Sequence, residues 1–249
     1  MSVLATKKIN IRSLVRQLKR KGYKIFTRPY ELNIVGVRAN STTPDQFDDI
    51  IYVFYKNDKG FWKGKAYPAT TDPGTYWLKN PMNPKGSAIL KEGQYVDAWI
   101  RRPHNGTYMA LGQEGPVTVW RDYDRDAVLD WSNGKEDTGS GFGINIHRAS
   151  SSSKGKNLQK TIQKSSAGCQ VFQNADDFDE FMDMVVKQKD LYGNKFTYTL
   201  IDERAYVRSL KRYGIYVLLG VGSLAMYVGI RTYLNKPLIP TKIKKGISK

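Results

Sequence analysis

The chain contains very few of the residues that build covalent or metal-held scaffolds. Its 249 residues include one cysteine, Cys169, and two histidines, His104 and His147. A single cysteine excludes an intramolecular disulfide framework, and these three side chains are too few for a His/Cys zinc cage. We therefore expect a protein that works without a resident metal or cofactor.

Two targeting and architectural signals are also missing. The first residues, MSVLATKKINIRSL, contain no apolar run of the kind that forms a secretory leader. No internal repeat is visible at solenoid periods. The large N-terminal part is therefore expected to be made in the cytosol, as one large domain or two small ones.

Acidic residues are in the minority, which leaves a strong positive charge. The chain has 40 Lys and Arg against 23 Asp and Glu, a formal net charge of +17. Such a surplus favours anionic partners: nucleic acid, acidic lipid headgroups or the polymers of a bacterial wall. No zinc-finger, helix-turn-helix or RNP-type pattern accompanies the charge, so nucleic acid is the least favoured of the three.

One long apolar run lies near the C-terminus. Residues 213–234 read YGIYVLLGVGSLAMYVGIRTYL, with no charge before Arg231. The 18 uncharged residues before Arg231, at about 1.5 Å each, span roughly 27 Å as a helix, about one hydrocarbon core. Basic segments at 204–212 and 235–249 flank the run and suit an anionic membrane surface. We predict a single transmembrane helix over 213–234; the alternative is a buried core helix.

The rest of the chain is patterned as a mainly β domain. Apolar residues at helical spacing predict a helix over 11–18, ended by Gly22, and a second helix over 176–189. Between them lie short runs rich in Val, Ile, Tyr and Trp, separated by turn residues. These predicted strands lie within residues 24–39, 49–56, 60–70, 95–102, 108–112, 116–123 and 142–149. The spacing predicts a mainly antiparallel sheet or a β-sandwich.

These signals divide the chain into five parts. We expect a basic amphipathic helix with a lead-in strand at 1–28, a β-rich domain at 29–203, a basic linker at 204–212, the membrane helix at 213–234 and a basic tail at 235–249. Residues 149–165 are polar and poor in apolar side chains, which predicts a loop inside the β-rich domain.

Cys169 and His147 form the one plausible nucleophile–base pair. A thiol must lose its proton to attack, and a nearby imidazole accepts that proton and later returns it to the leaving group. His147 ends the predicted strand FGINIHRA, and Cys169 follows the turn SSAG. Gly168 allows a tight turn, so that backbone amides near Cys169 can point at a developing oxyanion. The competing interpretation is a small, buried and unreactive cysteine.

These residues resemble the catalytic motif of the L,D-transpeptidases (YkuD-type), a histidine in an Ile-His-Gly turn followed by Ser/Thr-His-Gly-Cys. Ile146-His147 matches the first element, and Ser166, Gly168 and Cys169 match the second. The likeness extends over roughly residues 30–185, which are similar to wall-lytic proteins of bacteriophages. This resemblance implies a β-sandwich-like catalytic domain in which a cysteine attacks a peptide carbonyl of the peptidoglycan stem.

The resemblance also implies roles for individual side chains. Cys169 is the nucleophile and His147 its base, the Gly168 and Cys169 amides are oxyanion donors, and Ser166 supports the turn. Three positions depart from the family pattern: Arg148 replaces a glycine, Ala167 replaces a histidine, and Gln170-Val171 stands where Asn or Arg is usual. Since the departures affect substrate choice most, a variant hydrolase is favoured over a cross-linking enzyme. We assign substrate contacts to Arg148, His104 and Gln170.

The sequence thus predicts a membrane-anchored, phage-encoded enzyme that modifies peptidoglycan with a Cys–His site. A wall enzyme made in the cytosol needs delivery, and a virion that contains its own membrane would carry it to the wall of a new host. The alternative is an inactive structural protein of the virion that links capsid proteins to the viral membrane, with Cys169 buried.

Overall fold

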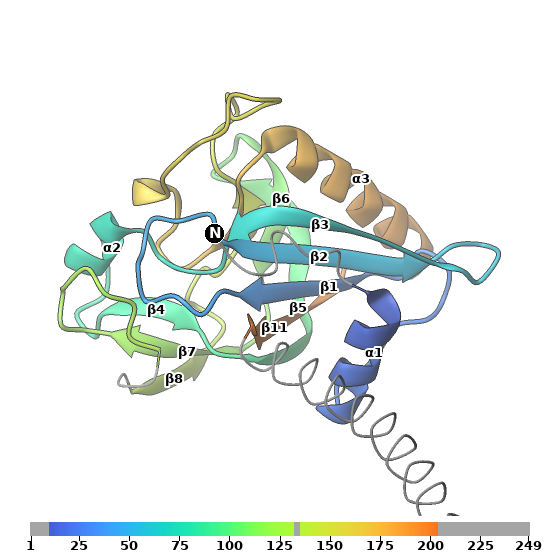
Figure 1. Cartoon of the computed structure of the whole chain (residues 1–249), viewed down its shortest axis with the longest axis horizontal. Coiled ribbons are helices and arrows are strands. Elements are labelled where there is room, and N and C mark those ends of the chain that lie inside the picture. Colours follow the sequence, from blue (N-terminus) through green and yellow to red (C-terminus); the bar gives the residue numbers. More distant parts are fainter. Residues whose placement is uncertain (1–9, 132–134, 204–249) are drawn as a thin grey trace, which may run out of the picture. The chain divides into compact units, whose positions relative to one another are not determined.

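The structure is a computed structural model of the chain (Figure 1). It describes residues 10–131 and 135–203. The predicted membrane helix at 213–234, its basic linker at 204–212 and the tail at 235–249 lie outside the described residues. Within the described ranges, no helix is long and apolar enough to cross a membrane.

The domain is mainly β, as its strand-rich sequence predicts. Eight strands form one sheet that closes into a barrel in the order β1-β11-β5-β6-β9-β10-β3-β2 (Figure 1). Their bounds are β1 Asn33–Arg38, β2 Asp49–Lys56, β3 Trp62–Thr70, β5 Gly93–His104, β6 Tyr108–Gln113, β9 Ile146–Arg148, β10 Gln170–Phe172 and β11 Phe196–Asp202. A separate three-stranded sheet consists of β4 Ser87–Leu90, β7 Val117–Asp122 and β8 Glu136–Gly139.

The predicted sandwich is therefore replaced by a closed barrel with a small second sheet. Closure depends on β11, which pairs in parallel with β1 and antiparallel with β5. The short strand β9 completes the ring by pairing with β6 on one side and β10 on the other. The ring is closed by short pairings here, since β10 pairs with β3 only at Ala69 and Thr70 and β6 pairs with β9 only through Leu111 and Ile146.

Within residues 10–131 and 135–203, three α-helices and one 3₁₀ turn accompany the strands. Their bounds are α1 Ile11–Arg20, α2 Thr75–Lys79, α3 Ala175–Tyr192 and η1 Gln163–Ser165. Helix α1 covers the predicted 11–18 segment and is followed by Gly22 at a φ of 79°. Helix α3 begins at the Asn174 cap, whose side chain accepts a hydrogen bond from the Asp176 amide. Both predicted helices are thus present, each slightly longer than its apolar stripe.

The predicted lead-in strand before residue 28 does not form. Pro29 has no backbone N–H to give to a ladder, and Tyr30 has a φ of 60°, so the extended chain is interrupted there. The side chain of Asn33 instead binds both the N–H and the C=O of Phe26, and β1 begins only at Asn33. Residues 10–28 therefore contribute helix α1 and an irregular segment.

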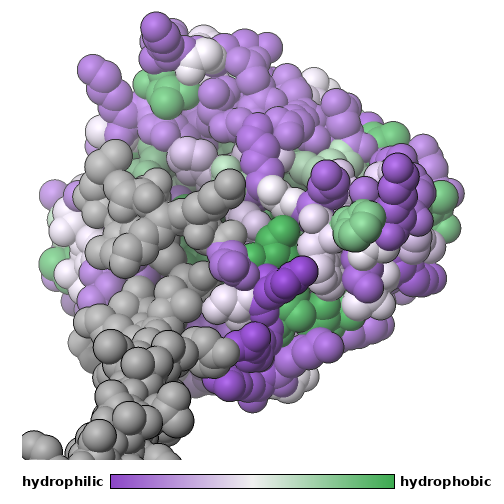
Figure 2. All heavy atoms as spheres, turned by 45° about the vertical axis from the view of Figure 1, so that its right-hand side comes forward, coloured by the Kyte–Doolittle hydropathy of each residue, from purple (hydrophilic) through white to green (hydrophobic). Residues whose placement is uncertain are grey.

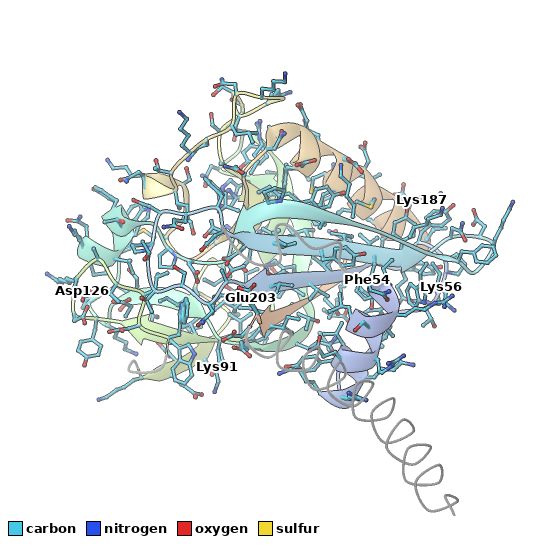
Figure 3. The ribbon with its side chains drawn as sticks, viewed as in Figure 1. Phe54, Lys56, Lys91, Asp126, Lys187 and Glu203 are labelled. Carbon is cyan, nitrogen blue, oxygen red and sulfur yellow. The ribbon has the colours of Figure 1, made fainter. Side chains whose placement is uncertain are left out.

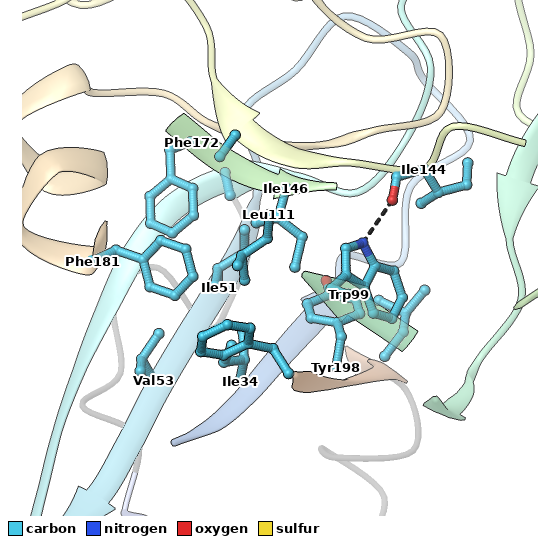
Figure 4. Close-up of a cluster of buried hydrophobic side chains, with 14 of the residues drawn as sticks. Ile34, Ile51, Val53, Trp99, Leu111, Ile144, Ile146, Phe172, Phe181 and Tyr198 are labelled. Carbon is cyan, nitrogen blue, oxygen red and sulfur yellow. Dashed lines mark hydrogen bonds between the residues drawn. The ribbon is translucent and has the colours of Figure 1, made fainter. Parts of the chain in front are cut away.

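The main core fills the barrel with aromatic and branched side chains (Figure 4). Trp99 and Tyr198 are fully buried with ring centroids 5.4 Å apart, and the Trp99 indole N–H donates to Ile144 O at 2.7 Å. Phe181 of α3 stacks on Phe172 of β10 at 5.0 Å. Helix α3 is thereby fixed against the strand that directly follows Cys169.

The outer surface is largely hydrophilic on the face shown in Figure 2. Exposed large hydrophobic side chains among the described residues include Phe61, which is 66% exposed at the turn between β2 and β3. Lys56 and Lys187 lie toward this end of the hairpin, and Lys91 and Glu203 lie away from it (Figure 3).

Candidate active site around Cys169 and His147

A serine-anchored turn brings the chain to Cys169. Ser166 is 1% exposed, and its hydroxyl donates to Cys169 O at 2.9 Å while accepting from the Gly168 N–H at 3.1 Å. Gly168 has a φ of 123°, and a Cβ there would lie 2.1 Å from Ala88 O, so no larger residue fits. Ser166 and Gly168 thus shape the turn. Since the Gly168 amide is already bound, the Cys169 amide is the remaining oxyanion donor of the pair.

Parallel pairing of β9 and β10 puts Cys169 and His147 on one face. His147 is the register partner of Val171, and side chains two residues apart on a strand point the same way. The pairing extends to the residue before β9, because the Gln170 N–H donates to Asn145 O at 2.8 Å. By the same alternation, Cys169, which directly precedes β10, lies on the side of Val171 and His147.

The His147 imidazole is buried and has one defined hydrogen bond. The residue is 6% exposed, and the ring atom Nδ1 lies 2.8 Å from Arg148 O. Burial, with a smaller effect of His104, lowers the pKa of His147 to about 4. A carbonyl oxygen only accepts, so the neutral ring must carry its proton on Nδ1. Nε2 then holds the free lone pair, which is the form a general base requires.

Three more planar groups continue from His147 in a row. The His104 ring stacks on His147 with centroids 4.4 Å apart and planes 20° apart. Tyr108 lies 5.3 Å from His104, and the Arg148 guanidinium lies over the Tyr108 ring at 4.3 Å. We call these four side chains, His147, His104, Tyr108 and Arg148, the stacked row. Its members come from β5, β6 and β9, three neighbouring barrel strands.

The thiol of Cys169 is turned toward the segment that precedes β9. Sγ donates to Gly143 O at 3.4 Å, and the residue keeps part of its surface in solvent. Surrounding protein nevertheless desolvates the sulfur, and this burial raises the pKa of the thiol to about 11, against a smaller lowering effect of the Asn145 backbone. At neutral pH the site thus holds a neutral thiol and a neutral imidazole. Within the described residues, the thiol hydrogen bond goes to Gly143 and not to His147.

The three residues assigned to substrate contact have different outcomes. His104 and Arg148 both belong to the stacked row and are half-buried. The assignment of Gln170 is wrong, because Gln170 is fully buried. Its Oε1 accepts from the Tyr198 hydroxyl at 2.7 Å, and its amide nitrogen lies 3.3 Å from Gly168 O. Strand alternation turns Gln170 into the barrel while its neighbour Cys169 faces outward.

Tyr108 is the site residue that sequence reasoning missed. It pairs with His104 across a hairpin whose turn contains Asn105 at a φ of 48° and Gly106 at a φ of 69°. An Asn-Gly pair between two β-type runs is a strong hairpin signal, and it could have placed Tyr108 opposite His104. Burial raises the Tyr108 pKa, so its hydroxyl stays protonated at neutral pH.

A second cluster of titratable groups lies where β1 and β11 end. Arg38, 3% exposed, forms an ion pair with Asp72 at 2.8 Å and donates to Leu90 O and Thr71 O. Asp49 accepts from the amides of Ala39 and Thr71, each at 2.6 Å. A pocket of about 440 Å³ borders this cluster, and its lining includes Glu92, Asp202, Trp120 and Trp131. Within residues 10–131 and 135–203, no group of three or more His, Cys, Asp or Glu side chains is placed to hold a metal ion.

Comparison of the chain with protein-family models, with curated proteins and with solved structures finds no match.

Proposed function

We propose that the chain is a cysteine-dependent enzyme that acts on peptide bonds of the bacterial cell wall. The observation that carries the proposal is the orientation of His147: its Nδ1–H is held by Arg148 O, which leaves Nε2 as a base on the face that also bears Cys169. The resemblance to the L,D-transpeptidases names the substrate, the peptide stem of peptidoglycan.

The reaction needs the thiol to leave Gly143 O and turn along the strand toward His147. Nε2 then takes the thiol proton while sulfur forms a bond to the substrate carbonyl carbon. The Cys169 amide offers a hydrogen bond to the oxyanion. As the carbon–nitrogen bond breaks, the imidazolium returns its proton to the leaving amine, which yields a thioester. Water, activated by the same nitrogen, completes hydrolysis; an amine in its place completes transpeptidation.

Proton transfer in this site is coupled to substrate attack. The pKa of Cys169 is about 11 and that of His147 about 4, so the thiolate–imidazolium pair lies far above the neutral pair in the free enzyme. At about 1.4 kcal/mol for each tenfold step, this gap is on the order of 9 kcal/mol. A substrate that brings its carbonyl to sulfur at the moment of transfer avoids a free thiolate. We therefore infer general-base catalysis without a preformed ion pair.

We also propose that residues 213–234 anchor the enzyme to a membrane, with the basic flanks on acidic headgroups. A virion membrane would then carry the domain to the wall of the next host. Purified particles that lack the chain, together with export of the domain to the periplasm of expressing cells, would contradict this delivery route.

A second candidate function is a structural link between capsid and membrane. The observation that favours it is the resting state of Cys169, whose thiol is bound to Gly143 O and whose pKa is raised. In that case the barrel is a scaffold and the thiol takes no part in chemistry.

One experiment separates the two functions. The full-length chain in detergent, as wild type, Cys169→Ala, His147→Asn and Lys63→Gln, is incubated with purified peptidoglycan, and released muropeptides are identified by mass spectrometry. We expect new products from wild type and from Lys63→Gln, an exposed position on β3, and at least a hundredfold less from the two site variants. Unchanged wall material with every variant, across several wall types, would favour the structural link.

A further inference from the structure

Arg148 is placed in the site without an anionic partner. Its guanidinium is half-buried against the Tyr108 ring at 4.3 Å, and within the described residues no carboxylate lies within 4.0 Å of it. The two arginines with the most buried side chains differ in this respect. Arg38, with its side chain 3% exposed, pairs with Asp72, and Arg121, with its side chain 9% exposed, pairs with Asp137 at 3.1 Å.

The stacking on Tyr108 leaves the guanidinium ready to bind an anion. The guanidinium carbon lies 4.3 Å from the centre of the Tyr108 ring, and this contact restricts where the group can lie. A guanidinium donates two parallel hydrogen bonds to a carboxylate. A partly desolvated cation whose position is restricted gains more from a charged partner than a flexible surface lysine does.

Arg148 directly follows His147 on β9 and is the pairing partner of Phe172. Its guanidinium contacts the Tyr108 ring, Tyr108 contacts His104, and His104 stacks on His147. The cation therefore belongs to the same group of side chains as the proposed base.

We propose that Arg148 binds a free carboxylate of the substrate, so that the enzyme prefers wall peptides that carry an acidic group near the attacked carbonyl. This inference rests on the proposed function and deepens it. It also gives a purpose to a departure from the family pattern, since Arg148 stands where the L,D-transpeptidase motif has glycine. Tyr108 is the positioning residue that restricts where the guanidinium can lie.

Binding tests the inference without requiring turnover. The full-length chain carrying Cys169→Ala is titrated in detergent with two soluble stem tetrapeptides, one with free carboxylates and one with each carboxylate converted to the primary amide. Isothermal calorimetry at pH 7 gives the dissociation constants. We expect the free peptide to bind about ten- to a hundredfold more tightly than the amide, as a charge-assisted pair predicts.

Variants of the same background assign the preference to Arg148. Arg148→Gln should bind both peptides equally, at the affinity of the amide, and Arg148→Lys should keep part of the preference because it keeps the charge but loses the planar fork. Lys63→Gln removes one positive charge from exposed β3 and should leave both affinities unchanged. Thermal unfolding of each variant checks that the fold is retained.

The outcomes separate this inference from the proposed function. Equal binding of the two peptides, no binding of either, or a preference that survives in Arg148→Gln would each overturn the role of Arg148. A carboxylate preference in the Cys169→Ala background, combined with no wall products from wild type, would support the binding site and contradict the catalytic function. Products from wild type without a preference would do the reverse.

Discussion

The stacked row and the carboxylate cluster around Arg38 are both groups of titratable side chains in desolvated surroundings, yet they are organised differently. Around Arg38, each charge is met from within the protein: Asp72 pairs with the guanidinium, and Asp49 takes two backbone amides. In the row, His147 is fixed through one nitrogen only and Arg148 has no carboxylate within the described residues. The first arrangement is complete without a ligand, whereas the second keeps a base and a cation free for one.

The same contrast appears in the direction of the pKa shifts. Burial raises the pKa of Asp49 to about 7, with a further raising effect of Asp72, and burial lowers that of His147 to about 4. Both shifts favour the neutral form, which is the general effect of desolvation. In the carboxylate cluster, hydrogen bonds and Arg38 oppose the shift and hold charge inside the fold. In the site, little opposes it, so the groups stay neutral until a substrate arrives.

The largest expected effect comes from removing the cation of the carboxylate cluster. Arg38→Met should lower the free energy of unfolding by about 3–5 kcal/mol at pH 8, because it leaves Asp49 and Asp72 buried without their partner. The loss should be smaller at pH 5, where the raised pKa of both carboxyls lets them protonate. Urea titration followed by tryptophan fluorescence measures both values on the full-length chain.

Arg148→Met is the matched control for this comparison. Arg148 has no buried ion pair to break, so we expect a cost below about 1 kcal/mol at either pH. A loss as large as that of Arg38→Met would mean that Arg148 serves the fold, and the contrast between the two clusters would disappear.

A smaller effect is expected in the reactivity of the sole thiol. With a pKa raised to about 11, Cys169 should react with iodoacetamide at pH 7 at least tenfold more slowly than an ordinary cysteine, because its thiolate fraction is far lower. The rate should keep rising up to about pH 10. Mass spectrometry of the intact chain follows the reaction, and the unfolded chain in urea provides the reference rate.

The pH profile of that reaction also checks the charge state of the site. A neutral thiol beside a neutral imidazole gives no plateau near pH 7, and His147→Ala should leave the profile almost unchanged. A plateau at neutral pH that disappears in His147→Ala would reveal a thiolate–imidazolium pair and would contradict the coupled proton transfer inferred above.

Much of the strand pattern was readable from the sequence, because it depends on local composition. The run at 49–56 is β2 to the residue, and the stretches at 60–70 and 116–123 contain β3 and β7. The barrel was not readable, because its closure depends on β11 pairing with β1 across more than 150 positions of sequence. The sequence of β11, FTYTLID, alternates Phe, Tyr and Leu with Thr, which is a strand pattern, but it does not name β1 as the partner.

The candidate site was predictable to a similar degree. The resemblance to the family motif predicts that Cys169 and His147 act as a pair, and the parallel register of β9 and β10 is consistent with this. No spacing rule predicts the stacking of His104 on His147. The sequence assigns Gln170 to substrate contact because it stands where the family motif has Asn or Arg. Alternation along β10 argues against that assignment, since a residue next to an outward cysteine points into the barrel.

The smallest expected effect concerns Asp48, at the edge of the carboxylate cluster. Burial raises its pKa to about 7, and the charges of Asp49 and Glu203 add to the shift. A carboxyl whose folded pKa lies above its unfolded value near 4 prefers the protonated form in the folded state. Its contribution to stability is therefore present below about pH 4 and is lost as the pH rises toward 7.

Asp48→Asn removes this loss of stability, so it should raise the Tm at pH 8 by about 2–4 °C and leave the Tm unchanged at pH 4. Differential scanning calorimetry at both pH values tests this prediction, with Asp126→Asn, an exposed carboxyl, as the control. A lower Tm for Asp48→Asn at pH 8 would mean that the Asp48 carboxylate is favourably bound in the folded state.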